Sequence, residues 1–180
     1  MKTEQLIKIG RTLAMLSFLI GTAIFVMNYL ISADSFLLIG YIFIVLAVVI
    51  NSIFLILIFI KLSKEKQYKT QLIISAGMIL LNIPVLLLYS WITSLLLNTM
   101  RIRFVNSTKE TITELKITGC QNKKIKKLEA EKSETVWISI KGDCTITIEY
   151  LLNGEPKKEN VLEYATTNTG HKMKYKIGEK

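Results

Sequence analysis

Long, uninterrupted apolar segments occupy the first hundred residues of the chain, and shorter alternating patterns occupy the rest. Three segments, Thr12–Ala33, Phe36–Ile60 and Gln71–Leu97, contain no Lys, Arg, Asp or Glu. A helix needs about 20 mainly apolar residues to cross the hydrocarbon core of a bilayer. The pattern therefore predicts three transmembrane helices, over about 12–33, 36–60 and 71–97, in a domain of residues 1–99.

The first segment could also be a cleaved signal peptide, because Lys2, Lys8 and Arg11 precede it. Its apolar run is longer than the roughly 7–15 residues of a signal-peptide core. In addition, Ile31-Ser32-Ala33 is a poor small-x-small cleavage site. We therefore expect an uncleaved helix. The link to the second helix, residues 32–35, is so short that the two helices should form an antiparallel hairpin.

From Met100 onward the apolar residues follow a period of two, which is typical of half-buried strands. The alternating sets are Ile102/Phe104, Leu115/Ile117, Val136/Ile138/Ile140, Ile146/Ile148/Tyr150, Leu162/Tyr164 and Met173/Tyr175/Ile177. Turn residues such as Asn153-Gly154 separate them. Six or seven short strands predict an antiparallel β-sandwich over residues 100–180, immunoglobulin-like in general shape.

The segment KLEAEKSETVWISI, residues 127–140, resembles the polar turn and outgoing strand of many bacterial Ig-like modules. The resemblance implies a fold element and no activity. The whole chain is thus expected to be an α+β membrane protein, in which three transmembrane helices precede an extracytoplasmic β-sandwich.

Charge distribution supports this division and predicts the topology. Residues 1–100 hold seven of the 23 Lys and Arg and three of the 14 Asp and Glu. Four lysines fill the Lys61–Lys69 loop, three basic residues precede the first helix, and the opposite loop carries only Asp34. Basic residues in short loops stay cytoplasmic. We therefore expect a cytoplasmic N-terminus and an extracytoplasmic domain after the third helix, although Arg101 and Arg103 follow that helix.

The net charge of +9 does not indicate nucleic-acid binding, because the lysines of residues 101–180 are interspersed with Glu and form no arginine-rich face. No G-x-S-x-G, H-E-x-x-H or Gly-rich phosphate loop occurs in the sequence. His171 is the one histidine, so it and the two cysteines fall short of the four ligands of a structural zinc site. We expect no enzymatic activity and no cofactor.

Cys120 and Cys144 are expected to form a disulfide outside the cytoplasm. Cys144 shares its strand parity with Ile146 and Ile148, and Cys120 follows Gly119, where a bulge could turn it toward the core. The alternative is a pair of unpaired buried thiols. A bridge over a loop of this length would stabilise the domain by roughly 3 kcal/mol.

Asn51 and Asn82 lie at matching depth in the second and third segments, about 15 Å from the cytoplasmic boundary. Amides in hydrocarbon need partners, so we expect a hydrogen bond between these two side chains. A polar site for an ion or solute is the alternative. A pore would require a homo-oligomer, which these helices could form.

Lys172, Lys174 and Lys176 alternate with apolar residues in the last predicted strand. Such a lysine row more often protects an edge strand from pairing with other chains. It could also bind an acidic partner or anionic lipid.

These features favour a non-enzymatic protein of the bacterial inner (cytoplasmic) membrane. Its sandwich would bind a protein partner in the envelope, as an accessory or scaffold subunit. The alternative is an immunity-type protein whose helices protect the membrane against a membrane-active toxin.

Overall fold

The computed structural model describes residues 1–32 and 34–179, and the chain forms two compact units, Met1–Trp91 and Ile92–Lys180. We call them the helical unit and the two-sheet unit. The division falls inside the third helix, whose last turn is hydrogen-bonded to a loop of the two-sheet unit. Ala33, the expected end of the first helix, and Lys180 lie outside the described residues.

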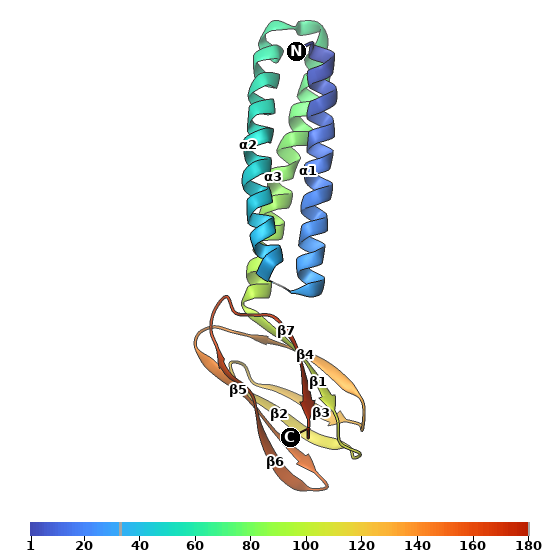
Figure 1. Cartoon of the computed structure of the whole chain (residues 1–180), viewed down its shortest axis with the longest axis vertical. Coiled ribbons are helices and arrows are strands. Elements are labelled where there is room, and N and C mark those ends of the chain that lie inside the picture. The colour runs from blue at the N-terminus through green and yellow to red at the C-terminus, as the bar shows by residue number, and fades with distance from the viewer. Residues whose placement is uncertain (33, 180) are drawn as a thin grey trace. The chain divides into compact units, whose positions relative to one another are not determined.

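Three long helices lie side by side in Figure 1: α1 (Thr3–Ile31), α2 (Asp34–Lys64) and α3 (Lys69–Leu97), with the short η1 (Lys66–Tyr68) before α3. All three are long and apolar enough to cross a membrane. They extend beyond the predicted segments at the ends that carry the basic residues, because helical hydrogen bonding continues past the apolar stretch. The prediction of three long apolar helices is confirmed.

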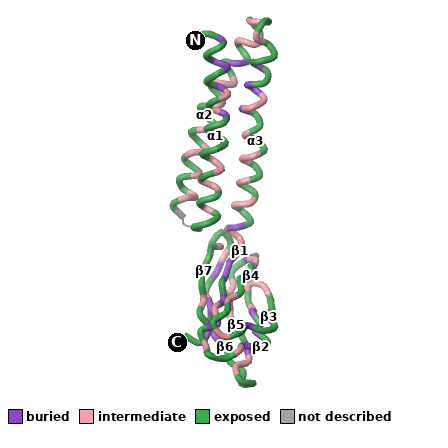
Figure 2. Tube along the Cα trace, turned by 90° about the vertical axis from the view of Figure 1, so that its right-hand side faces the viewer, coloured by how far each residue is buried: buried purple, intermediate pink, exposed green. Residues whose placement is uncertain are grey.

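The buried core of the helical unit lies near the end of the helices at which α1 begins, where Figure 2 shows purple positions on the helices. Leu6 from α1, Ile58 from α2 and Leu72 from α3 are almost completely buried there. Gly10 of α1 lies against this core, since a Cβ at its position would be in van der Waals contact with Cδ1 of Ile58 at 3.5 Å. Most other large apolar side chains of the helices are exposed, as expected of side chains that contact lipid.

The two-sheet unit contains seven strands, within the six or seven that the sequence predicts. They are β1 (Thr99–Asn106), β2 (Ile112–Gly119), β3 (Lys123–Leu128), β4 (Ser133–Ser139), β5 (Cys144–Leu152), β6 (Glu155–Ala165) and β7 (Lys172–Ile177). One sheet has the order β4-β1-β7 and the other β3-β2-β5-β6. All pairings are antiparallel except that of β1 with β7, the first and last strands.

Both sheets contribute to one core, which includes Phe104 from β1, Ile138 from β4 and Ile148 from β5, all fully buried. The predicted alternation is therefore correct for most strands. Tyr164 is an exception: it is 62% exposed, and Val161 and Ala165 are buried instead. Irregular pairing between β5 and β6 near Ile146 shifts the register and reverses the parity that the sequence suggested.

The strand order differs from that of a constant-type immunoglobulin domain. There the first, second, fifth and fourth strands form one sheet and the third, sixth and seventh form the other. Here β2 and β5 are paired as in that fold, but β3 and β6 flank them, and β4 lies beside β1. The expectation of an immunoglobulin-like unit does not extend to the strand order.

Within the two-sheet unit, the last turn of α3 is joined to β1 through Asn98 alone. The N–H of Gly170 donates to the carbonyl of Leu97 at 2.7 Å, and the N–H of Asn168 donates to Oδ1 of Asn98 at 3.2 Å. A Cβ at Gly170 would lie 2.6 Å from the Leu97 oxygen and from the Thr99 nitrogen. Only glycine therefore allows the loop before β7 to approach the helix end this closely.

Candidate functional site

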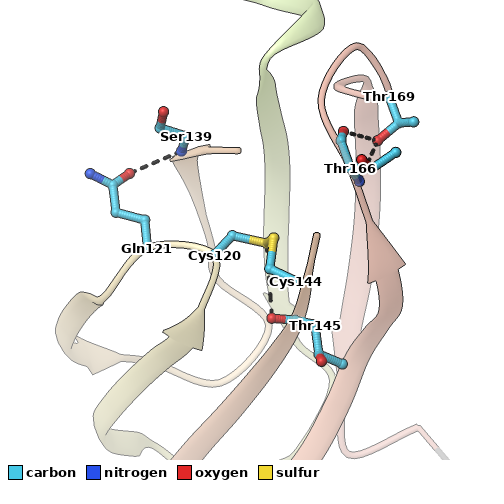
Figure 3. Close-up of a disulfide and its surroundings, with 7 residues drawn as sticks. All are labelled: Cys120, Gln121, Ser139, Cys144, Thr145, Thr166 and Thr169. Carbon is cyan, nitrogen blue, oxygen red and sulfur yellow. Dashed lines mark hydrogen bonds between the residues drawn. A yellow bond between two sulfur atoms is a disulfide. The ribbon is translucent and has the colours of Figure 1, made fainter. Parts of the chain in front are cut away.

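The predicted disulfide between Cys120 and Cys144 is present, with the two Cα atoms 5.1 Å apart (Figure 3). It joins the residue after β2 to the first residue of β5, and both cysteines pack against the core. The neighbouring Gln121 accepts a hydrogen bond from the backbone of Ser139 at 3.0 Å, as Figure 3 shows. Together these contacts hold the chain after β2 against both sheets.

Gly119 turns the chain into the disulfide. Its φ of 113° is in the region that favours glycine, and a Cβ at this position would lie 1.7 Å from the backbone oxygen of Thr145. The sequence suggested a bulge at Gly119. The structure places the irregularity of the β2–β5 pairing earlier, between Thr113 and Lys116, and Gly119 itself pairs with Ile146.

The predicted hydrogen bond between Asn51 and Asn82 is not seen among the described residues. Nδ2 of Asn51 donates to Oγ of Ser17 at 3.1 Å and to the Ala47 carbonyl at 2.8 Å. Nδ2 of Asn82 donates to the carbonyl of Ala14 at 3.1 Å. Both amides thus bond to α1. The equal depth of Asn51 and Asn82 in their segments, on which the prediction rested, does not reveal these partners.

Two further polar contacts between α1 and α3 were not predicted from the sequence. Nε of Arg11 donates to Oγ of Ser75 at 3.1 Å, and the hydroxyls of Thr22 and Tyr89 lie 3.0 Å apart. Tyr89 also stacks on Phe25, with ring centroids 4.4 Å apart. Thr and Tyr give little signal in an apolar helix, so their pairing could not be foreseen. The polar contacts of the helical unit consequently converge on α1.

The N-terminal end of α1 is fastened to the connection between α2 and α3. Glu65 contacts the Thr3 hydroxyl and forms an ion pair with Lys61 at 2.6 Å, while the Tyr68 hydroxyl donates to Glu4 at 2.9 Å. The two basic segments on which the predicted topology depends are thus at the same end of the helical unit.

The predicted lysine row lies on an edge strand, β7, as a guard against strand pairing requires. It does not stand alone. Residues of β7 and the central strand β1 are directly paired, Arg101 with Lys172 and Arg103 with Lys174. We call Arg103, Lys172, Lys174 and Lys176, all exposed, the basic face of the β4-β1-β7 sheet, opposite the core face formed by residues such as Ile102 and Phe104. Arg101 shares their side of β1 but is buried, with 4% exposure.

Trp137 of β4 extends this basic face. It is paired with Arg101, whose guanidinium carbon lies 5.9 Å from the centroid of the indole ring. The indole is 47% exposed, which is unusual for so large an apolar side chain. Arg103, next along β1, donates through Nε to the Ser133 hydroxyl at 3.0 Å. The sequence pattern did not reveal this combination because three separate strands contribute to it.

A buried carboxylate links the two sheets. Glu159 of β6 accepts hydrogen bonds from the hydroxyl of Tyr150 at 2.6 Å and of Tyr175 at 2.7 Å, and from the Gly178 N–H at 3.2 Å. Burial, then the hydrogen bond to Glu159, raises the pKa of each tyrosine above its usual value of 10.0. The carboxylate has protein donors for both oxygens, which makes it a structural link rather than a reaction site.

His171 lies in the loop before β7, where its Nδ1 is 2.9 Å from the carbonyl oxygen of Thr169. Among residues 1–32 and 34–179, no three His, Cys, Asp or Glu residues are arranged to hold a metal ion.

No protein-family model matches the sequence, and no curated protein matches it. One solved structure is similar, the NMR structure of a protein from Eubacterium rectale, with 15% identity and a TM-score of 0.36. The alignment covers 46% of this chain and 81% of that protein. A likeness at this level carries no argument about fold or function.

Proposed function

We propose that the chain is a membrane-anchored binding protein of the bacterial envelope, in which three transmembrane helices present the two-sheet unit outside the cytoplasm. The connection between α3 and β1 carries this proposal. Asn98 alone separates a long apolar helix from β1 of a disulfide-containing unit, and the Gly170–Leu97 hydrogen bond ties the loop before β7 to the helix end. Such a joint serves to hold a binding unit at the membrane surface.

The proposed orientation has a cytoplasmic N-terminus and an inner-membrane location. It is supported by the basic residues near Thr3 and in the Lys61–Lys69 connection, which the Glu65 and Tyr68 contacts hold at one end. Positively charged short loops remain cytoplasmic. The opposite end of α3 then leads outward, where an oxidising environment preserves the Cys120–Cys144 disulfide.

A reporter that is active only in the cytoplasm tests this orientation. Fused after Lys180 through a flexible linker, it should be silent, whereas fused before Met1 it should be active. A strong signal from the C-terminal fusion would overturn both the orientation and the extracytoplasmic role of the two-sheet unit.

The binding role is supported by a two-sheet unit that exposes Arg103, Lys172, Lys174 and Lys176 on one side of one sheet. We propose an accessory or scaffold subunit whose sandwich, immunoglobulin-like in outline but not in strand order, contacts a protein in the envelope. The alternative is an immunity-type protein that acts through its helices.

Removing the two-sheet unit separates these alternatives. A chain ending after Leu97 should lose the activity of a scaffold, measured as recovery of its cross-linked envelope partner. The same chain should still protect cells from a membrane-active toxin if the helices are the active part.

A further inference from the structure

Three exposed tyrosine and tryptophan side chains lie on the helical unit, one on each helix. Among the described residues of this unit, Tyr29 of α1, Tyr41 of α2 and Trp91 of α3 are 39%, 68% and 62% exposed. The other two tyrosines, Tyr68 and Tyr89, are partly buried, and their hydroxyls have partners within the unit. We call Tyr29, Tyr41 and Trp91 the aromatic belt.

Contacts between the helices place the aromatic belt at one level of the helical unit. On α2 the belt residue follows Gly40, where a Cβ would lie 3.5 Å from Cγ2 of Ile24. On α3 the belt residue comes two positions after Tyr89, which stacks on Phe25 with ring centroids 4.4 Å apart. Ile24 and Phe25 precede Tyr29 by four or five positions, which is little more than one helical turn.

The charged residues that end the apolar part of each helix lie toward the opposite end. They are Arg11 on α1, Lys61 on α2 and Lys69 on α3, and no Lys, Arg, Asp or Glu lies between them and the belt residue of the same helix. The separations are 18, 20 and 22 positions. At the helical rise of about 1.5 Å per residue, these separations span about 27, 30 and 33 Å.

These three lengths match the hydrocarbon core of a bilayer, which is about 30 Å thick. Tryptophan and tyrosine are enriched at membrane–water interfaces, and long basic side chains extend from helices toward the headgroups. The guanidinium of Arg11 extends along α3, where it donates to the Ser75 hydroxyl at 3.1 Å and to the Gln71 carbonyl at 3.4 Å. Gln71 is two positions from Lys69, so the charge of Arg11 lies close to the level of that lysine.

The burial of side chains along α1 changes at the same level. Leu6 and Ile7 precede Arg11 by five and four positions and are only 1% and 6% exposed. Leu16 and Leu19, between Arg11 and the aromatic belt, are 47% and 56% exposed. Removal of apolar side chains from water stabilises packing, whereas lipid solvates such side chains as well as protein does. The change in burial is therefore expected where α1 passes from water into lipid.

We propose that lipid acyl chains contact the helical unit only between the aromatic belt and the level of Arg11, Lys61 and Lys69. The belt residues lie in one headgroup layer, and the three basic side chains lie in the other. The last residues of α3, Ile92–Leu97, then lie outside the hydrocarbon, although their sequence continues the apolar run. This inference rests on the proposed function in one respect: it requires the helices to cross a membrane.

Trp91 can report its own depth in the full-length protein. The chain has two tryptophans, so Trp137→Phe leaves Trp91 as the only one. This variant is reconstituted in phosphatidylcholine vesicles that contain a minor lipid with a nitroxide either on the headgroup or near the end of the acyl chain. We expect the headgroup nitroxide to quench Trp91 more strongly than the acyl-chain nitroxide, because the indole lies at the interface.

Matched variants place a single tryptophan at other exposed sites, in a chain that also carries Trp91→Phe and Trp137→Phe. Leu81→Trp changes a site that is 65% exposed and about 15 Å from Trp91 along α3, so the acyl-chain nitroxide should quench it more strongly. Leu95→Trp and Ile9→Trp change sites that are 50% and 41% exposed and lie beyond the two boundaries. Both should be quenched more strongly by the headgroup nitroxide.

Two results would overturn the proposal. Stronger quenching of Trp91 by the acyl-chain nitroxide would move one boundary toward Leu97, where the apolar run ends. The same result for Ile9→Trp would move the other boundary beyond Arg11. Retention of the chain in membranes after an alkaline wash separately tests whether the helices are embedded. A chain that is retained but shows either result keeps the proposed function and loses this inference, whereas a chain that the wash releases loses both.

Discussion

The helical unit and the two-sheet unit are held together by different means. In the two-sheet unit the core contains many side chains with no exposure, including Phe104, Ile117 and Ile148, and a disulfide closes one end. In the helical unit the fully buried positions cluster near one end, and hydrogen bonds from Asn51, Asn82 and Arg11 also join the helices. Burial from water drives the packing of the first, whereas in lipid it contributes little and specific polar contacts matter more.

The largest difference should appear when a phenylalanine is truncated in each unit. Phe104→Ala removes a fully buried side chain and should lower the free energy of unfolding of the two-sheet unit by about 3–5 kcal/mol. Phe18→Ala removes a side chain of α1 that is 43% exposed and should change stability by less than about 0.5 kcal/mol. Thermal unfolding of the detergent-solubilised chain, followed by near-ultraviolet circular dichroism, measures both. Equal effects would mean that Phe18 packs against protein.

Reduction should affect one unit only, because both cysteines lie in the two-sheet unit. The double variant Cys120→Ala/Cys144→Ala should lose roughly 3 kcal/mol of stability, since the bridge constrains the unfolded chain. Protease resistance of residues 100–180 should fall in this variant and, for the native chain, after addition of a reductant. Alkylation of both thiols in the unreduced protein would show that the bridge does not form.

Alkaline pH should weaken the two-sheet unit through its buried tyrosines. The pKa of Tyr150 and of Tyr175 is raised in the folded state, so their contribution is complete below the ordinary value of 10.0 and is lost as pH rises above it. The native chain should therefore lose stability above pH 10.0 more steeply than Tyr150→Phe/Tyr175→Phe. Chemical denaturation over that pH range measures the slopes, and parallel slopes would contradict the expectation.

The carboxylate that those tyrosines share can be tested at neutral pH. Glu159→Gln keeps the size of the side chain but replaces charge-assisted hydrogen bonds with neutral ones, which should cost about 1–2 kcal/mol. Glu163→Gln, at an exposed position of the same strand, is the matched control and should have almost no effect. Chemical denaturation of both variants at pH 7 measures the difference, and a silent Glu159→Gln would mean that the sheets do not depend on this link.

The smallest effects should come from the asparagines of the helical unit, where each interhelical hydrogen bond contributes about 0.6 kcal/mol on average. Asn51 and Asn82 have separate partners on α1, so the effects of Asn51→Leu and Asn82→Leu should add. The pair that should couple is Asn51→Leu with Ser17→Ala. Double-mutant cycles, built from the free energies of unfolding in detergent, measure both couplings. A coupling between Asn51→Leu and Asn82→Leu would instead indicate a direct contact between the two asparagines.

The periodicity of apolar residues was sufficient to predict the helices and most strands, but not which strands pair with one another. The apolar runs and the period of two identify three helices and most strands, because both patterns follow from which neighbour, lipid or core, each side chain meets. β3 was not predicted: its buried residues, Ile125 and Leu128, are three apart in a run of lysines. The prediction that Tyr164 faces the core was wrong because the pairing of β6 with β5 is irregular near Ile146. Such an irregularity leaves no signal in the sequence of β6 itself.

For the candidate functional residues too, the sequence shows the individual residues but not which of them lie together. Cys120 and Cys144 could be paired because only two cysteines exist, so no choice of partner arises. The lysines of β7 were visible as a row, but Arg103 and Trp137 joined them only through the β4-β1-β7 order. Strand order depends on the packing of the whole unit, which local patterns do not encode.

The parallel pairing of β1 with β7 has a consequence for how the protein is made. β1 is the first of the seven strands to leave the ribosome, yet its register with β7 requires residues 172–177, which are synthesised after the other six strands. Ile177, fully buried, belongs to the same core as Phe104. A nascent chain that ends at residue 171 would still lack one strand of the β4-β1-β7 sheet and would expose β1 along one edge. A premature stop codon at any of codons 172–177 should therefore yield a product that the cell's proteases remove.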